Sequence, residues 1–247
     1  MGETFSELLS FEPARVPALS AKKSHGNIRV IFCLLITLAT TLWFFEFNRN
    51  MAKGYPSYLT PVEWLGVTTA MYGLSLVPLA AVLLIEKLAF KTKLLPALGL
   101  RRKPGAVGSK GKFIALIFAV NLLIFLFRFL LRKNGQFTPV YLLLKIPEHM
   151  IIALCEEVMF RGYVQNVMTG KLGDWPGILA AAVLFLVVHL PVRILFQYEN
   201  PVQLTYSLAT TLVGGIFFGA AARKDTCVHG AAALHFAANI CHQIAFS

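Results

Sequence analysis

The sequence predicts an all-α, polytopic integral membrane protein with about seven transmembrane helices, and three observations lead to this prediction. Of the 247 residues, 57% are hydrophobic and only 14% are charged, more apolar material than one soluble core of this size accommodates. The apolar residues gather into stretches of about 20, the length that spans roughly 30 Å of hydrocarbon. The basic residues lie between these stretches, which is typical of membrane proteins that follow the positive-inside rule.

Seven stretches are long and apolar enough to be predicted as membrane helices. They cover residues 30–47, 62–85, 113–131, 140–168, 176–196, 202–222 and 226–246. The fourth of them is interrupted by charged residues. We therefore divide the chain into a polar tail (1–29), an N-terminal membrane part with a basic loop (30–139) and a C-terminal membrane part (140–247).

The loop between the second and third stretches gives the strongest signal for topology. It contains eight basic residues and one acidic residue, Glu86. The basic residues are Lys87, Lys91, Lys93, Arg101, Arg102, Lys103, Lys110 and Lys112. Such a loop is expected in the cytoplasm, which also places the N-terminus there and the C-terminus outside. The tail carries no apolar stretch of the signal-peptide type, so we expect the first helix to remain as the insertion signal. In a bacterium this would be the inner membrane.

Net charge and cysteine content exclude two other classes of protein. The formal net charge is +11, but the basic residues lie between apolar segments and no nucleic-acid motif is present, so we expect contact with anionic lipid headgroups instead of nucleic acid. The four cysteines lack the paired spacing of a metal site or a disulfide framework. The oligomeric state stays open.

Charged residues inside the fourth stretch require a reason, because each costs a few kcal/mol near membrane depth. Glu157 and Arg161 are spaced i and i+4, so they share a helix face and form a natural ion pair. Adjacent helix positions differ by about 100°, so Glu156 points elsewhere and is able to accept a proton from water. Taken alone, Glu157 with Arg161 is equally well explained as a pair that locks helix packing.

Two later stretches carry polar residues at helical spacing. Phe185 and His189 share a face in the fifth stretch, and His235 and Asn239 share one in the seventh. Counted from the expected cytoplasmic ends at about 1.5 Å per residue, Glu156 and these three polar residues lie about 14 to 20 Å deep. We therefore predict that they meet in one intramembrane cavity. A lone histidine on an apolar face would more often be a core residue.

This ordered set of motifs, Glu-Glu-x-x-x-Arg, Phe-x-x-x-His and His-x-x-x-Asn, resembles the CPBP family of intramembrane proteases, which includes CAAX-processing enzymes. The resemblance covers roughly residues 140 to 247 and makes this segment the expected catalytic core. It implies an endopeptidase in which Glu156, helped by His189, activates water for attack on a peptide carbonyl. His235 and Asn239 would donate hydrogen bonds to the oxyanion. Glu157, Arg161 and Phe185 would support and orient these groups.

The expected substrate is a membrane protein or a lipidated peptide, with a C-terminal sorting tail as one form of it. A metal-free mechanism is favoured, and the alternative is a zinc site made by Glu156, His189 and His235. Arg161 is a poor neighbour for a divalent cation, and no His-Glu-x-x-His motif occurs. Two other functions stay open: a proton-coupled transporter, because intramembrane ionisable residues also mark ion pathways, and a non-catalytic scaffold or immunity protein.

Overall fold

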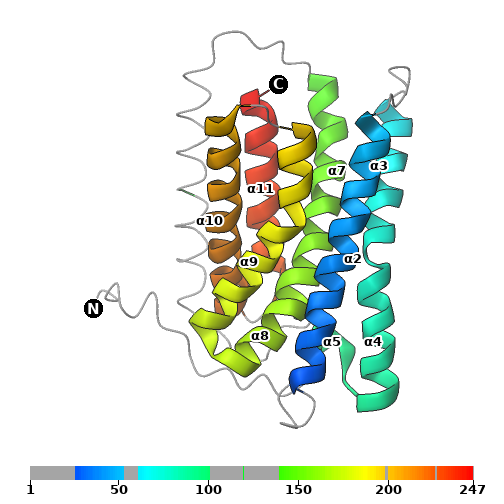
Figure 1. The fold of residues 1–247 in the computed structure, drawn as a ribbon. Coiled ribbons are helices and arrows are strands. Elements are labelled where there is room, and N and C mark those ends of the chain that lie inside the picture. Colours follow the sequence, from blue (N-terminus) through cyan, green and yellow to red (C-terminus); the bar gives the residue numbers. More distant parts are fainter. Residues whose placement is uncertain are drawn as a thin grey trace.

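Apolar stretches in lipid must satisfy their backbone polar groups internally, so they fold as helices. The computed structural model describes residues 26–52, 61–100, 119, 139–197, 200–225 and 227–246, and these contain helices and no β-strand (Figure 1). The elements in chain order are α2 (Gly26–Ala52), α3 (Pro61–Ser75), α4 (Val77–Phe90), α5 (Leu94–Ala97), α7 (Pro139–Glu157), the π-helix η2 (Val158–Val164), α8 (Gln165–Leu172), α9 (Asp174–Val192), the π-helix η3 (Arg193–Gln197), α10 (Pro201–Asp225) and α11 (His229–Phe246). The predicted all-α class is confirmed for the described residues.

The predicted stretches correspond to these elements with two differences. The second stretch is divided into α3 and α4 at Leu76, because Pro78 stands at the start of α4 and its ring is compatible with the first turn of a helix but not with its interior. The fourth stretch continues from α7 through η2 into α8 without leaving the helical path. Apart from residue 119, the third stretch, 113–131, lies outside the described residues, so the count of seven stays a prediction.

The helices surround α9, which packs against α2, α8 and α10, while α7 lies between α3 and α11. Gly173 joins α8 to α9 with a φ of 88°, a conformation that is open to glycine and strained for other residues. This sharp reversal allows α8 and α9 to pack along each other. Figure 1 shows the start of α2, the end of α4, the α8–α9 turn and the α10–α11 turn at one end of the bundle. The sequence predicts these four points on one side of the membrane.

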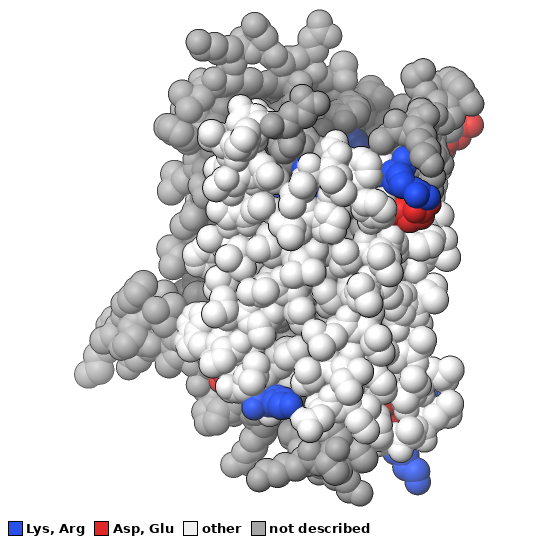
Figure 2. Space-filling view, viewed as in Figure 1, with Lys and Arg blue, Asp and Glu red and all other residues white. Residues whose placement is uncertain are grey.

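The surface of the bundle has the character expected of a membrane protein. Large apolar side chains such as Leu38 (55% exposed) and Leu42 (58%) lie on its outside. On the face drawn in Figure 2, charged residues lie toward the two ends, and the band between them is uncharged. Among the described residues, four segments are long and apolar enough to cross a membrane: Gly26–Arg49, Leu65–Phe90, Asp174–Phe196 and Pro201–Asp225. α7 and α11 are not among them, and both carry polar residues of the site described next.

Candidate active site

Three helices bring one carboxylate and two imidazoles together. Glu156 lies on the last turn of α7, His189 near the end of α9 and His235 on the second turn of α11. The Nε2 atom of His189 is 3.9 Å from Glu156 Oε1, and the Nε2 atom of His235 is 3.6 Å from Glu156 Oε2. These separations exceed those of a direct hydrogen bond but allow one water molecule to contact both groups. Glu156 and His235 are buried, and the His189 side chain is 23% exposed.

The His189 ring is oriented by its own helix. Its Nδ1 atom lies 2.9 Å from the carbonyl oxygen of Phe185, one turn earlier. Because a carbonyl only accepts hydrogen bonds, Nδ1 carries a proton, and when the ring is neutral it presents an unprotonated Nε2 to Glu156. The Phe-x-x-x-His spacing therefore matters for the backbone carbonyl of Phe185 as well as for its side chain.

The second imidazole is oriented by the second glutamate. Glu157, which is fully buried, lies 2.9 Å from His235 Nδ1 and 3.1 Å from the Nη1 atom of Arg161. The predicted ion pair of Glu157 with Arg161 is therefore present. The expectation that Glu156 and Glu157 point to different places needs a correction. Their carboxylates leave the helix in different directions, yet they reach opposite nitrogens of the same His235 ring, because α11 packs along α7.

Aromatic rings fill the space between the charged groups. The Phe185 ring centroid lies 4.4 Å from the guanidinium carbon of Arg161, 4.6 Å from the ring of His189 and 6.0 Å from that of His235. A guanidinium over an aromatic face is attracted to the ring and is screened from lipid by it. Phe185 therefore contacts three of the predicted site residues at once, and its orienting role stays a prediction.

Phe218 on α10 is a site residue that sequence reasoning did not find. Its ring stacks on His235 with centroids 5.0 Å apart and an interplanar angle of 17°, and it lies 5.8 Å from the Arg161 guanidinium. In the sequence it is one of two adjacent phenylalanines in an apolar helix. The available signal was its position between Gly215 and Gly219, whose small size indicates a face that packs closely against other helices.

Gly215 and Gly219, two of the three glycines of α10, bring its backbone to the site, which is the packing role of a Gly-x-x-x-Gly pair between membrane helices. The carbonyl oxygen of Gly215 accepts a hydrogen bond from Arg161 Nη2 at 3.3 Å, and that of Gly219 accepts one from Gln165 Nε2 at 2.9 Å. A Cβ atom on Gly215 would lie 3.1 Å from the Cβ atom of Ala182 on α9. The close approach of α10 thus provides one acceptor for the buried guanidinium of Arg161 and another for the amide of Gln165.

Asn239 lies one turn beyond His235 on α11 and is half-buried. In the part of the chain that the structure describes, it makes no hydrogen bond with another residue. Its assignment as a second oxyanion donor therefore stays a prediction. The same holds for the cavity predicted around these groups.

The zinc alternative stays open, and it requires several ligands placed around one point. Over the described residues, no group of three or more His, Cys, Asp and Glu side chains is placed so that it could hold a metal ion. The Nε2 atoms of His189 and His235 both face Glu156, but the Nη1 atom of Arg161 is 3.1 Å from the adjacent Glu157, and a cation so near opposes the binding of another.

The fold and the site define a class: a helical membrane protein in which a glutamate and two histidines from three helices meet inside the bundle. Within that class, residues 138–241 match the Rce1-like family, described as type II CAAX prenyl endopeptidase Rce1-like. This match confirms the resemblance to CPBP intramembrane proteases that the motifs indicated. No curated protein and no solved structure matches the chain.

Proposed function

We propose that the chain is an intramembrane endopeptidase that uses Glu156 as the general base for water. The observation that carries the proposal is the convergence of the His189 and His235 Nε2 atoms on the two oxygens of Glu156, at 3.9 and 3.6 Å. The Rce1-like match of residues 138–241 supports a protease of the CAAX type. The substrate we expect is a membrane-associated peptide, either lipidated or ending in a sorting tail.

In this proposal a water molecule lies between Glu156 and the unprotonated Nε2 of His189. Glu156 takes a proton from the water as its oxygen attacks the peptide carbonyl carbon, and the proton then passes to the departing amine. The Phe185 carbonyl keeps the His189 ring in the tautomer that accepts a hydrogen bond from the water. The reaction needs no group outside the chain other than water and the substrate.

His235 and Asn239 would stabilise the oxyanion. His235 Nδ1 lies 2.9 Å from Glu157, and this contact turns Nε2 toward Glu156, from where it can donate to the oxyanion when it carries a proton. Asn239 offers an amide donor one turn away. Buried donors aimed at developing negative charge contribute about 2.7–4 kcal/mol each in enzymes of known mechanism.

The test is cleavage of lipidated and transmembrane peptides by the detergent-purified chain. Replacement of Glu156 by Gln keeps the shape and removes the base, so we expect the rate to fall by about 10²–10⁴. Glu63→Gln, which changes an exposed glutamate of α3, serves as the control and should cleave at the native rate. A strong chelator should have no effect, and loss of activity on chelation would instead favour the zinc site.

The proposal fails if the native chain and Glu156→Gln are equally inert toward all peptides. Uptake of a small solute that depended on Glu156 would then favour a transporter.

A further inference from the structure

The N-terminal helices, which lie outside the matched family segment, meet the helix of the two glutamates at a buried polar cluster. Its members are Arg29 on α2, Glu86 on α4, Thr92 just after α4, and Tyr163 in η2, and we refer to it as the Glu86 cluster. Arg29 donates two hydrogen bonds to the Glu86 carboxylate, at 2.8 and 2.9 Å. Thr92 donates a third at 2.8 Å, and the Tyr163 hydroxyl donates a fourth to Oε1 at 3.1 Å.

This position of Glu86 differs from the one that the sequence suggested. The sequence places it as the single acid of a basic loop, where it would be solvated. In the structure its side chain is fully buried, as is that of Tyr163. A buried carboxylate is stable only when a cation and hydrogen-bond donors compensate for the lost water, and α2, α4 and η2 together provide them.

Tyr163 belongs to a helical segment whose register is not the ordinary one. The backbone N–H of Gln165 donates to the carbonyl of Phe160, five residues earlier, where an α-helix would use a donor four residues away. Such π-helical turns are rare and occur mostly as single turns inside α-helices, frequently at functional sites. Reversion to an α-helix would change the register by one residue. The helix before η2 would then turn by about 100° relative to the helix after it.

That rotation matters because residues of the site lie directly before η2 and within it. Glu156 and Glu157 end α7 directly before it, and Arg161 lies within it. Arg161 contacts Glu157 and Phe185 on the side of the site, whereas Tyr163, two residues later, contacts Glu86 on the side of α2 and α4.

The neighbouring residue of η2 is held from the same side. A Cβ atom on Gly162 would lie 2.5 Å from the carbonyl oxygen of Leu98, in the segment that follows α4. This close backbone contact and the Tyr163 hydrogen bond fix two successive residues of the π-helical turn. Both contacts come from residues of the N-terminal half of the chain.

We propose that Glu86 and Tyr163 are positioning residues for the reaction. The hydrogen bond between them selects the π-helical register of η2 and so aims Glu156 and Glu157 at the two histidines. The catalytic part of this inference rests on the proposed function, but the geometric part does not. It assigns the N-terminal helices a defined task in a site whose reacting groups all come from the matched segment.

The test combines a peptidase assay with a spectroscopic reading of the site. Tyr163→Phe removes only the hydroxyl, and loss of a hydrogen bond to a charged group should lower kcat about tenfold while KM changes less than twofold. The chain has six histidines, so NMR of ¹⁵N-labelled histidine rings can follow the His235 Nδ1–H that is bonded to Glu157. We expect this resonance to move in Tyr163→Phe.

Two further variants make the result specific. Thr37→Val removes another buried hydroxyl of the N-terminal part, one that donates to the carbonyl of Cys33 within α2, and it should leave both kcat and the His235 resonance unchanged. The double variant Arg29→Leu/Glu86→Leu removes the ion pair together with the acceptor of the Tyr163 hydroxyl, so it should shift the His235 resonance as Tyr163→Phe does. This double variant decides the matter if Tyr163→Phe does not fold, because an unchanged resonance would overturn the inference.

The inference is overturned if Tyr163→Phe retains the native kcat and His235 resonance, or if Thr37→Val shifts that resonance equally. If the native chain cleaves no peptide, but the resonance moves in Tyr163→Phe alone, the positioning role stands and the proposed function falls.

Discussion

At the scale of single residues, the site is ordered by what each imidazole does with its Nδ1 atom. His189 directs Nδ1 to the Phe185 carbonyl and His235 directs it to Glu157, each at 2.9 Å. Both rings are thereby turned so that Nε2 faces Glu156. A hydrogen bond at one ring nitrogen fixes the orientation and the proton of the other. Two different partners thus produce the same result on opposite sides of one carboxylate.

The ring of Phe218 gives a prediction at this scale. Its replacement by Leu removes the ring that stacks on His235 and lies near the Arg161 guanidinium. We therefore expect kcat to fall about tenfold, which corresponds to a loss of about 1.4 kcal/mol of transition-state stabilisation. The measurement is steady-state peptide cleavage.

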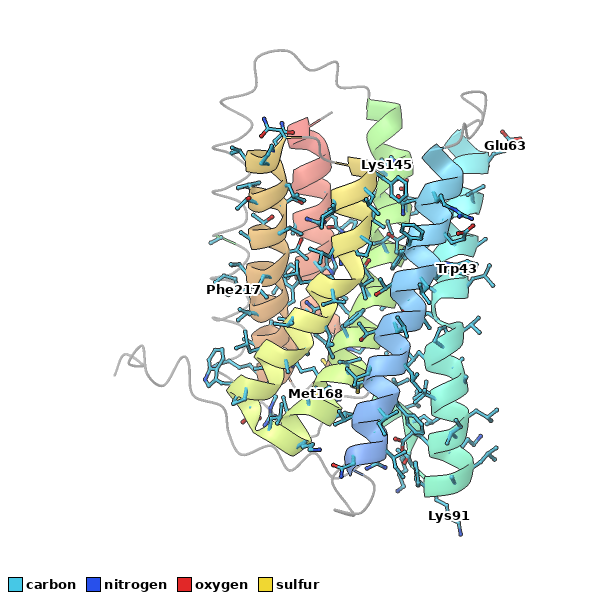
Figure 3. The ribbon with its side chains drawn as sticks, in the orientation of Figure 1. Trp43, Glu63, Lys91, Lys145, Met168 and Phe217 are labelled. Carbon is cyan, nitrogen blue, oxygen red and sulfur yellow. The ribbon has the colours of Figure 1, made fainter. Side chains whose placement is uncertain are left out.

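The neighbouring phenylalanine is the matched control. Phe217 is 45% exposed, and Figure 3 shows it on the side of α10 turned away from α9. Phe217→Leu should retain the native rate. Equal losses in the two variants would show that Phe218 acts only through the general apolarity of α10.

At the scale of elements, the decisive feature is the contact of α10 with α9 and η2. Small residues at helix interfaces in membranes allow backbones to approach, because lipid provides no hydrophobic force to bring larger side chains together. At Gly219 a Cβ atom would lie 2.5 Å from Gln165 Oε1 and 3.0 Å from the Cγ2 atom of Ile178. Gln165 and Ile178 therefore fill the space beside Gly219, and no room for a side chain remains there.

Alanine at Gly219 should accordingly be destabilising. We expect a loss of about 1–3 kcal/mol, because the added methyl must displace Gln165 from the carbonyl that accepts its hydrogen bond. Gly214→Ala is the control on the same helix, since its Cβ atom would meet only the Phe218 ring at an ordinary 3.5 Å. Thermal unfolding in detergent, read by circular dichroism, compares the two. A Gly219→Ala protein as stable as Gly214→Ala would contradict the close contact.

At the scale of the whole molecule, the bundle has two distinct ends. Figure 3 shows Lys91 at the end that holds the α8–α9 turn and Glu63 at the opposite end. The basic loop follows α4 at the Lys91 end. We therefore propose that the Lys91 end faces the cytoplasm and that the N-terminus lies on that side, as the positive-inside rule predicts.

Cysteine labelling in intact cells tests this orientation. A membrane-impermeant maleimide should label Glu63→Cys directly, but Lys91→Cys only after the cells are permeabilised. Both positions are exposed in the structure, and the native chain, in which Cys33 and Cys227 are buried, provides the background. The reverse pattern of labelling would invert the topology.

The sequence by itself determined the class of fold and predicted which residues form the site. Apolar length dictates helices because lipid cannot satisfy a free backbone. Three short motifs, each five or six residues long, were enough to predict the family that residues 138–241 match. The pairing of Glu157 with Arg161 followed from i, i+4 spacing alone. These are local properties, since the residues that make each contact are neighbours along the chain.

Tertiary structure alone decided the contacts between helices. The meeting of Glu156 and Glu157 on one imidazole depends on α11 lying along α7, and the stack of Phe218 on His235 depends on how α10 approaches. The burial of Glu86 depends on Arg29 and Tyr163, which lie 57 and 77 residues away in the chain. Residue spacing cannot predict contacts over such separations. The helical period places a side chain on a face of its own helix, but the packing of whole helices determines what that face contacts.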